Sequence, residues 1–365
     1  MLTPSSDPIF VRASVSGKCN LNCIYCPKAE GMENRVPEIL RGHDLSADDY
    51  ISNLRHLARN GLRGVAFTGG EPTLNHDLPR IVAAASSIFE RVELTTNGRF
   101  LPEMLPDLAP YLNLLKVSLD AAELQRVMSI TNGTSLESER AIASIRTGCA
   151  AGLRVGINVV VMGSTVDQID RIIELCREIN SQGFPGNAYV SLLDFYYSEE
   201  RRTMWEREFL PLSELVPRFT SKNSPSIAQI RFGCRFYWFD INGVQIRFKD
   251  SIGITHRALK CQDCRRYCQE GIYGLKLSIE GWVTTCPTGD PDYGIHLVSG
   301  ISDHDADQRL APLLQDIRSA HPDSNSFITM LNKHGLRPSS RSGAFLPIIG
   351  QSPPSLPENA KERDG

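Results

Sequence analysis

The chain has 365 residues with a formal net charge of −3, and 41% of its residues are hydrophobic while 22% are charged. These proportions are those of an ordinary globular protein with one large or two unequal domains. The small net charge argues against nucleic-acid binding by bulk electrostatics. No apolar run is long enough to cross a bilayer, and the first eight residues lack the basic flank and apolar core of a signal peptide. We therefore expect a cytoplasmic protein with neither a nucleic-acid nor a membrane partner.

An apolar strand-like segment, Phe10–Val15, leads directly into three cysteines, Cys19, Cys23 and Cys26. Thiolates with this C-x3-C-x2-C spacing can converge on one metal centre from a single loop. A structural zinc site needs four ligands, and neither a fourth Cys nor a His stands in this loop. An iron–sulfur cluster with one iron left open to an external ligand suits three sulfurs better, and a zinc loop completed by a distant residue is the alternative.

Further strands are predicted along the chain, and helices separate them. Ser46 and Asp49 mark the start of the first helix, which ends at Asn60-Gly61. Other helices are predicted over residues 78–89, 101–109, 136–151 and 166–180. The predicted strands are Phe10–Val15, Gly64–Thr68, Arg91–Thr95, Leu114–Leu119, Leu153–Met162 and Ala188–Phe195. This alternation predicts an α/β fold with a parallel sheet; because it stops after six units, we expect a partial (βα)6 TIM-like barrel over residues 8–200.

Polar motifs follow several of these strands. The cysteine loop, Gly69–Pro72, Thr96-Asn97 and Asp120 each stand at the carboxyl end of a predicted strand. Ligands of parallel α/β sheets bind at this edge, so we expect one shared active site there. Gly69 and Gly70 would let a ligand approach the backbone closely because glycine has no Cβ.

Beyond residue 200 the alternation stops. Residues 198–219 are predicted to be helical, and residues 230–248 predict short strands around a hairpin turn at Asn242-Gly243. Residues 338–365 are rich in Pro and Ser and are predicted to be a disordered tail. Residues 201–337 would then form a second, smaller domain.

Ten cysteines in a chain expected to be cytoplasmic indicate metal binding or catalysis rather than disulfides. A second group follows the predicted hairpin: Cys261, Cys264, Cys268 and Cys286. Four sulfurs can complete a tetrahedral shell for zinc or hold an iron–sulfur cluster, and the spacing leaves both open. Cys149 and Cys176 lie on the inner faces of predicted helices, where a free Cys packs as a small hydrophobe.

The first cysteine loop and Gly69–Pro72 resemble motifs of the radical SAM superfamily, in which an aromatic residue, here Tyr25, precedes the last Cys. The resemblance implies that Cys19, Cys23 and Cys26 hold a [4Fe-4S] cluster whose open iron binds S-adenosylmethionine (SAM). It also implies an electron donor such as flavodoxin or ferredoxin, and a hydrogen abstraction from a small-molecule substrate. Residues implied in SAM binding are Gly69, Gly70, Glu71, Pro72, Thr96, Asn97, Ser118, Asn158 and Met162.

The chain as a whole resembles the GTP 3′,8-cyclases of molybdenum cofactor biosynthesis, densely over residues 10–180 and more loosely over 275–286. This resemblance implies an auxiliary [4Fe-4S] cluster held by the second cysteine group, in a half-SPASM/Twitch-like domain, and a substrate site with Arg12 and Lys276. Gly64 and Gly156, however, stand where the cyclases carry lysines. A triphosphate needs several cations, so we expect a different small polar metabolite, derived from a nucleotide or a sugar, that undergoes cyclisation, rearrangement, epimerisation or oxidation.

Three alternatives stay open at this point. A true GTP 3′,8-cyclase is one. A peptide-modifying radical SAM enzyme is another, although such enzymes commonly carry a docking domain before the barrel and this chain begins its first strand by residue 10. A zinc-binding protein without activity is the third. Cys234 is a candidate hydrogen-atom donor, with a packed structural Cys as the simpler interpretation.

Overall fold

The computed structural model describes residues 10–26, 43–220, 227–231, 234–250, 255–261, 264, 268–269, 271–272, 274–286, 294–323, 331–332 and 335–336. The predicted tail over residues 338–365 lies outside them. In the described ranges no helix is long and apolar enough to cross a bilayer.

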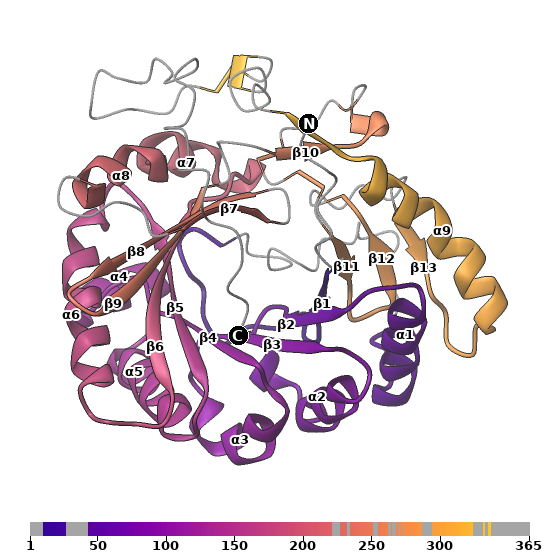
Figure 1. The fold of residues 1–365 in the computed structure, drawn as a ribbon, viewed down its shortest axis with the longest axis horizontal. Coiled ribbons are helices and arrows are strands. Elements are labelled where there is room, and N and C mark those ends of the chain that lie inside the picture. Colours follow the sequence, from indigo (N-terminus) through magenta and orange to yellow (C-terminus); the bar gives the residue numbers. More distant parts are fainter. Residues whose placement is uncertain are drawn as a thin grey trace.

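Six parallel strands form the centre of a curved sheet, in the order of the sequence. They are β1 (Phe10–Ser14), β2 (Gly64–Thr68), β3 (Arg91–Thr96), β4 (Leu114–Ser118), β5 (Arg154–Val161) and β6 (Asn187–Asp194). Helices connect them: α1 (Ala47–Arg59), α2 (Leu78–Ser86), α3 (Leu101–Leu108), α4 (Leu124–Thr131), α5 (Ser135–Ala150) and α6 (Ile169–Asn180). Figure 1 shows these helices outside the curve of the sheet. The predicted partial (βα)6 barrel is confirmed.

Local sequence explains how the first helix begins. The side chain of Ser46 accepts a hydrogen bond from the backbone N–H of Asp49 at 3.2 Å, which satisfies one of the free donors of the first turn. The helix ends at Asn60, and Gly61 follows with φ +93°, a conformation that glycine adopts without strain. Both ends agree with the sequence prediction.

The later part of the chain continues the same sheet at both edges. β11 (Leu275–Leu277) pairs in parallel with β1, and β12 (Trp282–Thr284) and β13 (Gly294–His296) follow antiparallel. At the other edge β9 (Val244–Asp250) pairs in parallel with β6 and is followed by β8 (Cys234–Ile241) and β7 (Ile227–Arg231). The turn between β8 and β9 has Asn242 at φ +52° and Gly243 at φ +81°, which confirms the predicted hairpin.

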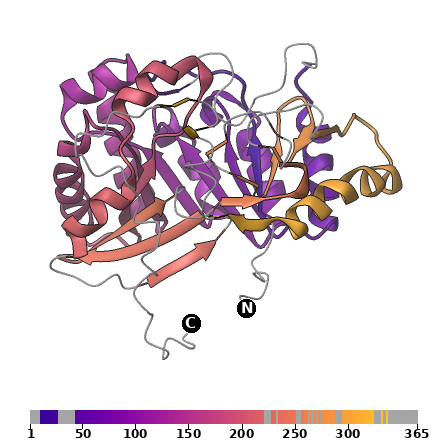
Figure 2. The same ribbon diagram turned by 90° about the horizontal axis from the view of Figure 1, so that it is seen from above.

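Further helices flank these added strands (Figures 1 and 2). After β6 the chain forms η5 (Glu199–Arg201), α7 (Arg202–Glu208) and α8 (Leu212–Thr220). Near the opposite edge, α9 (Asp303–Ser319) lies beside α1, where Asp307 pairs with Arg59 at 2.6 Å. β10 (Thr255–Arg257) and β14 (His321–Asp323) form a separate antiparallel pair.

Side chains alternate along each strand, so one face of the sheet meets the helices and the other lines the barrel interior. The helix-facing side is mostly apolar and buried, as Val65, Phe67, Leu115 and Val117 show. Cys149 and Cys176 are completely buried in this layer, as predicted. The interior face carries the charged and polar groups that are described below.

Candidate active site

The first cysteine loop leaves β1 and packs directly against the Gly69–Pro72 turn after β2. The N–H of Gly70 donates to the carbonyl oxygen of Ser16, and the N–H of Glu71 to that of Lys18, both at 2.7 Å. A Cβ at Gly70 would lie 2.5 Å from the carbonyl carbon of Lys18, so only glycine allows the two backbones to approach this closely. The two motifs that the sequence singled out therefore form one structural unit.

The buried carboxylate of Glu71 joins this unit to the end of β3. Its side chain accepts hydrogen bonds from the N–H of Thr73 (3.0 Å), the hydroxyls of Thr73 and Thr96 (2.6 Å each) and the N–H of Asn97 (2.7 Å). Burial raises the pKa of Glu71, and these hydrogen bonds oppose the increase. The Glu71 and Thr96 side chains thus hold two strand-end loops together.

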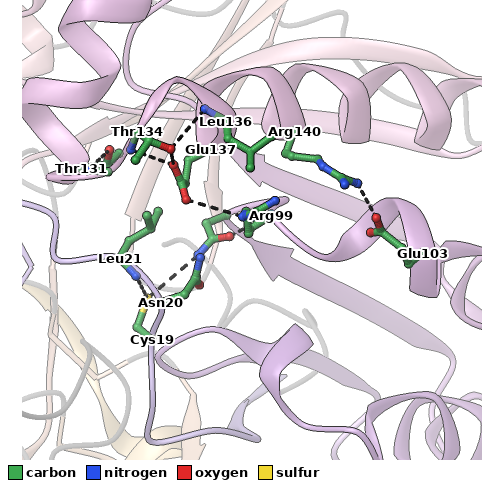
Figure 3. Close-up of polar contacts among 12 residues, drawn as sticks. Cys19, Asn20, Leu21, Arg99, Glu103, Thr131, Thr134, Leu136, Glu137 and Arg140 are labelled. Carbon is green, nitrogen blue, oxygen red and sulfur yellow. Dashed lines mark hydrogen bonds and ion pairs between the residues drawn. The ribbon is translucent and has the colours of Figure 1, made fainter.

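Two polar groups lie near the sulfur of Cys19, the first cysteine of the loop. The N–H of Leu21 donates to Sγ of Cys19 at 3.5 Å (Figure 3), and Nδ2 of Asn97 lies 4.0 Å from the same sulfur. Asn97 also donates to the side chain of Asn20 at 2.9 Å. Figure 3 shows the loop beside the start of α5, where Thr134 and Glu137 form a capping box.

The donor set suits an iron–sulfur cluster. Cys19 is exposed and Cys23 and Cys26 are half-buried on the same loop. Burial raises the pKa of Cys23, and the nearby Asp120 and Cys26 raise it further, so a positively charged centre is needed to hold this sulfur as a thiolate. In the part of the chain that the structure describes, no three His, Cys, Asp or Glu side chains are spaced for a single metal ion. A cubane places each thiolate on a different iron and therefore accepts a wider spacing.

Tyr25, just before the last Cys of the loop, is tied to the end of β4. Its hydroxyl donates to Oδ2 of Asp120 at 2.7 Å, and the other oxygen of Asp120 accepts from the N–H of Val160 at 2.7 Å. Burial raises the pKa of Asp120 to about 6 against these two hydrogen bonds. The Tyr25 ring also packs edge-on against Phe195 after β6, with centroids 6.5 Å apart. The cysteine loop is thus attached to three strand ends.

The remaining residues expected to bind SAM lie in different surroundings. Ser118 and Asn158 are neighbours across β4 and β5, half-buried at the carboxyl ends of the strands. The side-chain oxygen of Asn158 is buried and accepts no hydrogen bond from the described residues. Met162 is completely buried in the hydrophobic core. A buried oxygen without a donor suits a ligand that brings one.

The barrel interior holds two cations, Lys116 and Arg247, that sequence reasoning missed and that join the expected Arg12. Lys116 on β4 pairs with Glu93 on β3, which also accepts from Nε of Arg91 at 2.6 Å. Burial lowers the pKa of Lys116; Glu93 opposes this, whereas the nearby Arg247 and Arg12 lower it further. Like charges held this close indicate a site that an anion would stabilise. Only the arrangement of four separate strands brings these residues together, so no local signal could have found them.

Arg247 on β9 lies among three aromatic rings in the barrel interior. Its guanidinium donates to the hydroxyl of Ser191 at 2.7 and 3.2 Å. It also lies over the rings of Tyr189, Phe236 and Trp238, at 5.5 to 5.9 Å from their centroids.

The two glycines that differ from the cyclase pattern face aromatic rings. A Cβ at Gly64 would lie 2.8 Å from Cζ of Phe10, and one at Gly156 would lie 2.8 Å from the hydroxyl of Tyr189. Any side chain at either position would therefore displace a ring. The aromatic rings occupy the space into which longer side chains would extend.

The second cysteine group is only partly described. Cys261, Cys264, Cys268 and Cys286 are all partly exposed. Burial raises the pKa of Cys261; Arg257 lowers it, and the proximity of Cys268 and Cys286 raises it again. Lys276 is the register neighbour of Arg12 across β11 and β1, and the side chain of Cys234 is outside the described part.

Comparisons with known proteins agree with this geometry. Residues 13–176 match the model of the Radical SAM superfamily. The chain is 27% identical over 282 residues to the probable GTP 3′,8-cyclase of Methanococcus maripaludis, covering 75% of this chain and 84% of that one. It is 26% identical over 300 residues to the GTP 3′,8-cyclase of Listeria monocytogenes, covering 78% and 81%. The crystal structure of Streptococcus suis SuiB bound to S-adenosylmethionine aligns with a TM-score of 0.55 and 16% identity, over 86% of this chain and 68% of SuiB, and shows the shared fold.

Over residues 13–176, the partial barrel with its cysteine loop after the first strand matches the Radical SAM superfamily, and the chain is an enzyme. Over about three quarters of its length it is also similar to GTP 3′,8-cyclases. The expected cofactors follow from these relationships: a [4Fe-4S] cluster with SAM, and the auxiliary cluster that such cyclase-like proteins carry.

Proposed function

We propose that this enzyme abstracts a hydrogen atom from a small anionic metabolite derived from a nucleotide or a sugar, which then cyclises, rearranges, epimerises or is oxidised. The main supporting observation is the barrel interior. There Arg247 donates to Ser191 at 2.7 Å, Arg12 is the register neighbour of Lys276, and both arginines lower the pKa of Lys116. An anionic group of a substrate would relieve this repulsion in a site of low dielectric.

Cys19, Cys23 and Cys26 would ligate the cluster that binds SAM. When bound, this cluster supplies one electron to SAM, which cleaves to methionine and a 5′-deoxyadenosyl radical. The protein's own contribution would be positional. Gly69 and Gly70 would present the backbone of the turn to the methionyl group, and Asn158 would offer its buried oxygen to a donor of the cofactor.

The auxiliary cluster would be held by Cys261, Cys264, Cys268 and Cys286 within residues 201–337. Four protein ligands would close its shell, so this cluster would pass electrons or stabilise the fold rather than bind substrate. A one-electron donor such as flavodoxin or ferredoxin would supply the electrons. We further propose a cytoplasmic location without nucleic-acid or membrane partners, in keeping with the net charge of −3.

The alternative that the relatives favour is a GTP 3′,8-cyclase, since the chain matches two of them over three quarters of its length. Against a triphosphate stand Gly64 and Gly156, whose inner sides are covered by Phe10 and Tyr189. The cations of this interior also stand on other strands than the cyclase lysines: Lys116 is on β4 and Arg247 on β9, whereas Gly64 and Gly156 are on β2 and β5. A smaller anion with one or two charges suits this set. A peptide-modifying activity has only the shared fold in its favour.

The test is anaerobic reconstitution followed by iron and sulfide counts and 5′-deoxyadenosine release. The substrate panel contains GTP, nucleoside monophosphates, sugar phosphates and the same compounds without phosphate. We expect turnover with a nucleoside monophosphate or a sugar phosphate. Arg247→Gln should raise the KM for that substrate at least tenfold, while the exposed Arg218→Gln should not. Cyclisation of GTP alone would establish the alternative. Wild-type iron content and SAM cleavage after all three loop cysteines are replaced by alanine would refute the cluster assignment.

A further inference from the structure

An arginine from the far side of the barrel holds the last cysteine of the cluster loop. Arg201 is the last residue of η5, the short helix that follows β6. Its Nε and Nη2 both donate to the carbonyl oxygen of Cys26, at 3.2 and 3.0 Å. The two residues are 175 positions apart in the sequence. This two-pronged contact fixes the end of the loop against the chain that follows the sixth strand.

The segment that carries Arg201 is itself firmly held. The N–H of Arg201 donates to the carbonyl of Ser198 at 3.0 Å. Trp205, completely buried, donates from its indole to the carbonyl of Phe195 at 2.9 Å and stacks on Phe209 with centroids 4.4 Å apart. The segment therefore offers the guanidinium from a packed support.

Residue Gln269, beside Cys268 of the second group, is attached to the same segment. Its amide accepts from the N–H of Tyr197 at 3.1 Å and donates to the carbonyl of Phe195 at 3.3 Å. One stretch of chain thus contacts the surroundings of both cysteine groups.

The charge of Arg201 distinguishes it from its neighbours. Arg202 pairs with Glu206 at 3.5 Å, and Arg207 pairs with Glu208 at 3.0 Å. No carboxylate of the described residues pairs with Arg201, whose side chain is half-buried. A guanidinium that is partly withdrawn from water and lacks a counter-charge exerts a stronger field on its surroundings than a paired one.

We propose that Arg201 is a positioning residue that holds the cluster loop and raises the reduction potential of the cluster bound to it. The inference rests on the proposed function, which places a [4Fe-4S] cluster at Cys19, Cys23 and Cys26. One-electron reduction adds a negative charge to that cluster, and net charge and hydrogen bonding around a cluster set its potential. An uncompensated cation beside Cys26 stabilises the reduced form and so eases the reduction that SAM cleavage requires.

The experiment compares wild type, Arg201→Gln, Arg201→Lys and the control Arg202→Gln after anaerobic reconstitution. Iron and sulfide are counted first, which tests the cluster independently of Arg201. A potentiometric titration then follows the EPR signal that SAM perturbs, and hydrogen exchange is measured for the peptide that contains residues 19–26.

We expect Arg201→Gln to lower the reduction equilibrium constant on the order of tenfold, about 59 mV for one electron. Exchange in the cluster loop should accelerate in both Arg201 variants, because each loses the two-pronged contact. Arg201→Lys keeps the charge, so its potential should stay near that of wild type, as should that of Arg202→Gln.

An unchanged potential in Arg201→Gln at full cluster content would overturn the electrostatic role, as would an equal shift in Arg201→Lys. Unchanged hydrogen exchange of residues 19–26 in both Arg201 variants would overturn the positioning role. This test also applies if Arg201→Gln binds no cluster. If the wild type itself holds no cluster at the three cysteines, the proposed function fails first, and this failure is seen in the iron count.

Discussion

Replacing Glu71 by Gln tests whether its carboxylate holds the strand-end loops together. The carboxylate is 1% exposed and accepts four hydrogen bonds, three through Oε1 and one through Oε2. An amide keeps only one acceptor oxygen. If that oxygen faces Thr73 and Thr96, the amide nitrogen meets the N–H of Asn97, and two donors oppose each other in a site closed to water.

The expected loss follows from these contacts. A lost hydrogen bond costs about 1 kcal/mol, and a buried donor without an acceptor costs about 1–3 kcal/mol more. We therefore expect Glu71→Gln to lower the free energy of unfolding by about 2–4 kcal/mol. SAM binding should weaken as well, because Gly69 and Gly70 adjoin the same side chain.

Urea unfolding of anaerobically prepared protein, followed by tryptophan fluorescence, measures this loss as a lower midpoint at an unchanged slope. The control is Glu90→Gln, since Glu90 is 63% exposed and, among the described residues, forms its ion pair with Arg63 at the surface. That variant should stay within about 0.5 kcal/mol of wild type. If the Glu71→Gln midpoint coincides with the Glu90→Gln midpoint, the interpretation of Glu71 as the tie between the loops is wrong.

Two further predictions concern the barrel interior and the glycine turn. Burial alone would raise the pKa of Glu93, but Lys116 and a neighbouring arginine lower it to about 2. The ionised side chain therefore contributes roughly 3 kcal/mol to the free energy of unfolding above pH 4.5, and this contribution is lost as the pH falls towards 2. Glu93→Gln should thus be less stable than wild type at pH 7, and the difference should shrink in urea titrations at pH 3; a constant difference would contradict the assignment. Gly70→Ala should destabilise the fold by about 1–3 kcal/mol and weaken SAM binding in calorimetry, because the alanine Cβ would meet the backbone of Lys18. Gly163→Ala is the control: its Cβ would lie 3.7 Å from the nearest atoms of Glu208, so it should change neither quantity.

Most of the local structure could be read from the sequence. The predicted strand Gly64–Thr68 is confirmed without change, and the predicted strand Leu153–Met162 is one residue shorter at each end in the structure. Helix α4 (Leu124–Thr131), an eight-residue helix without a side-chain cap, was not predicted. Buried strands and capped helices carry their signal within a few residues, which is why such segments are recognisable without the fold.

The sequence by itself determined the order of strands and helices, the cysteine loop and its glycine turn, and hence the resemblance to the radical SAM superfamily. The tertiary structure alone decided which residues face one another across the barrel: Arg247 beside Ser191, Tyr189 over Gly156, and Arg201 on Cys26. It also decided that β7–β9 and β11–β13 extend the two edges of the barrel sheet, whereas only β10 and β14 among the described strands pair separately. The physical reason is the distance along the sequence over which each kind of interaction acts. Periodicity and capping act over a few neighbouring residues, whereas these contacts join segments that are brought together only by the pairing of distant strands.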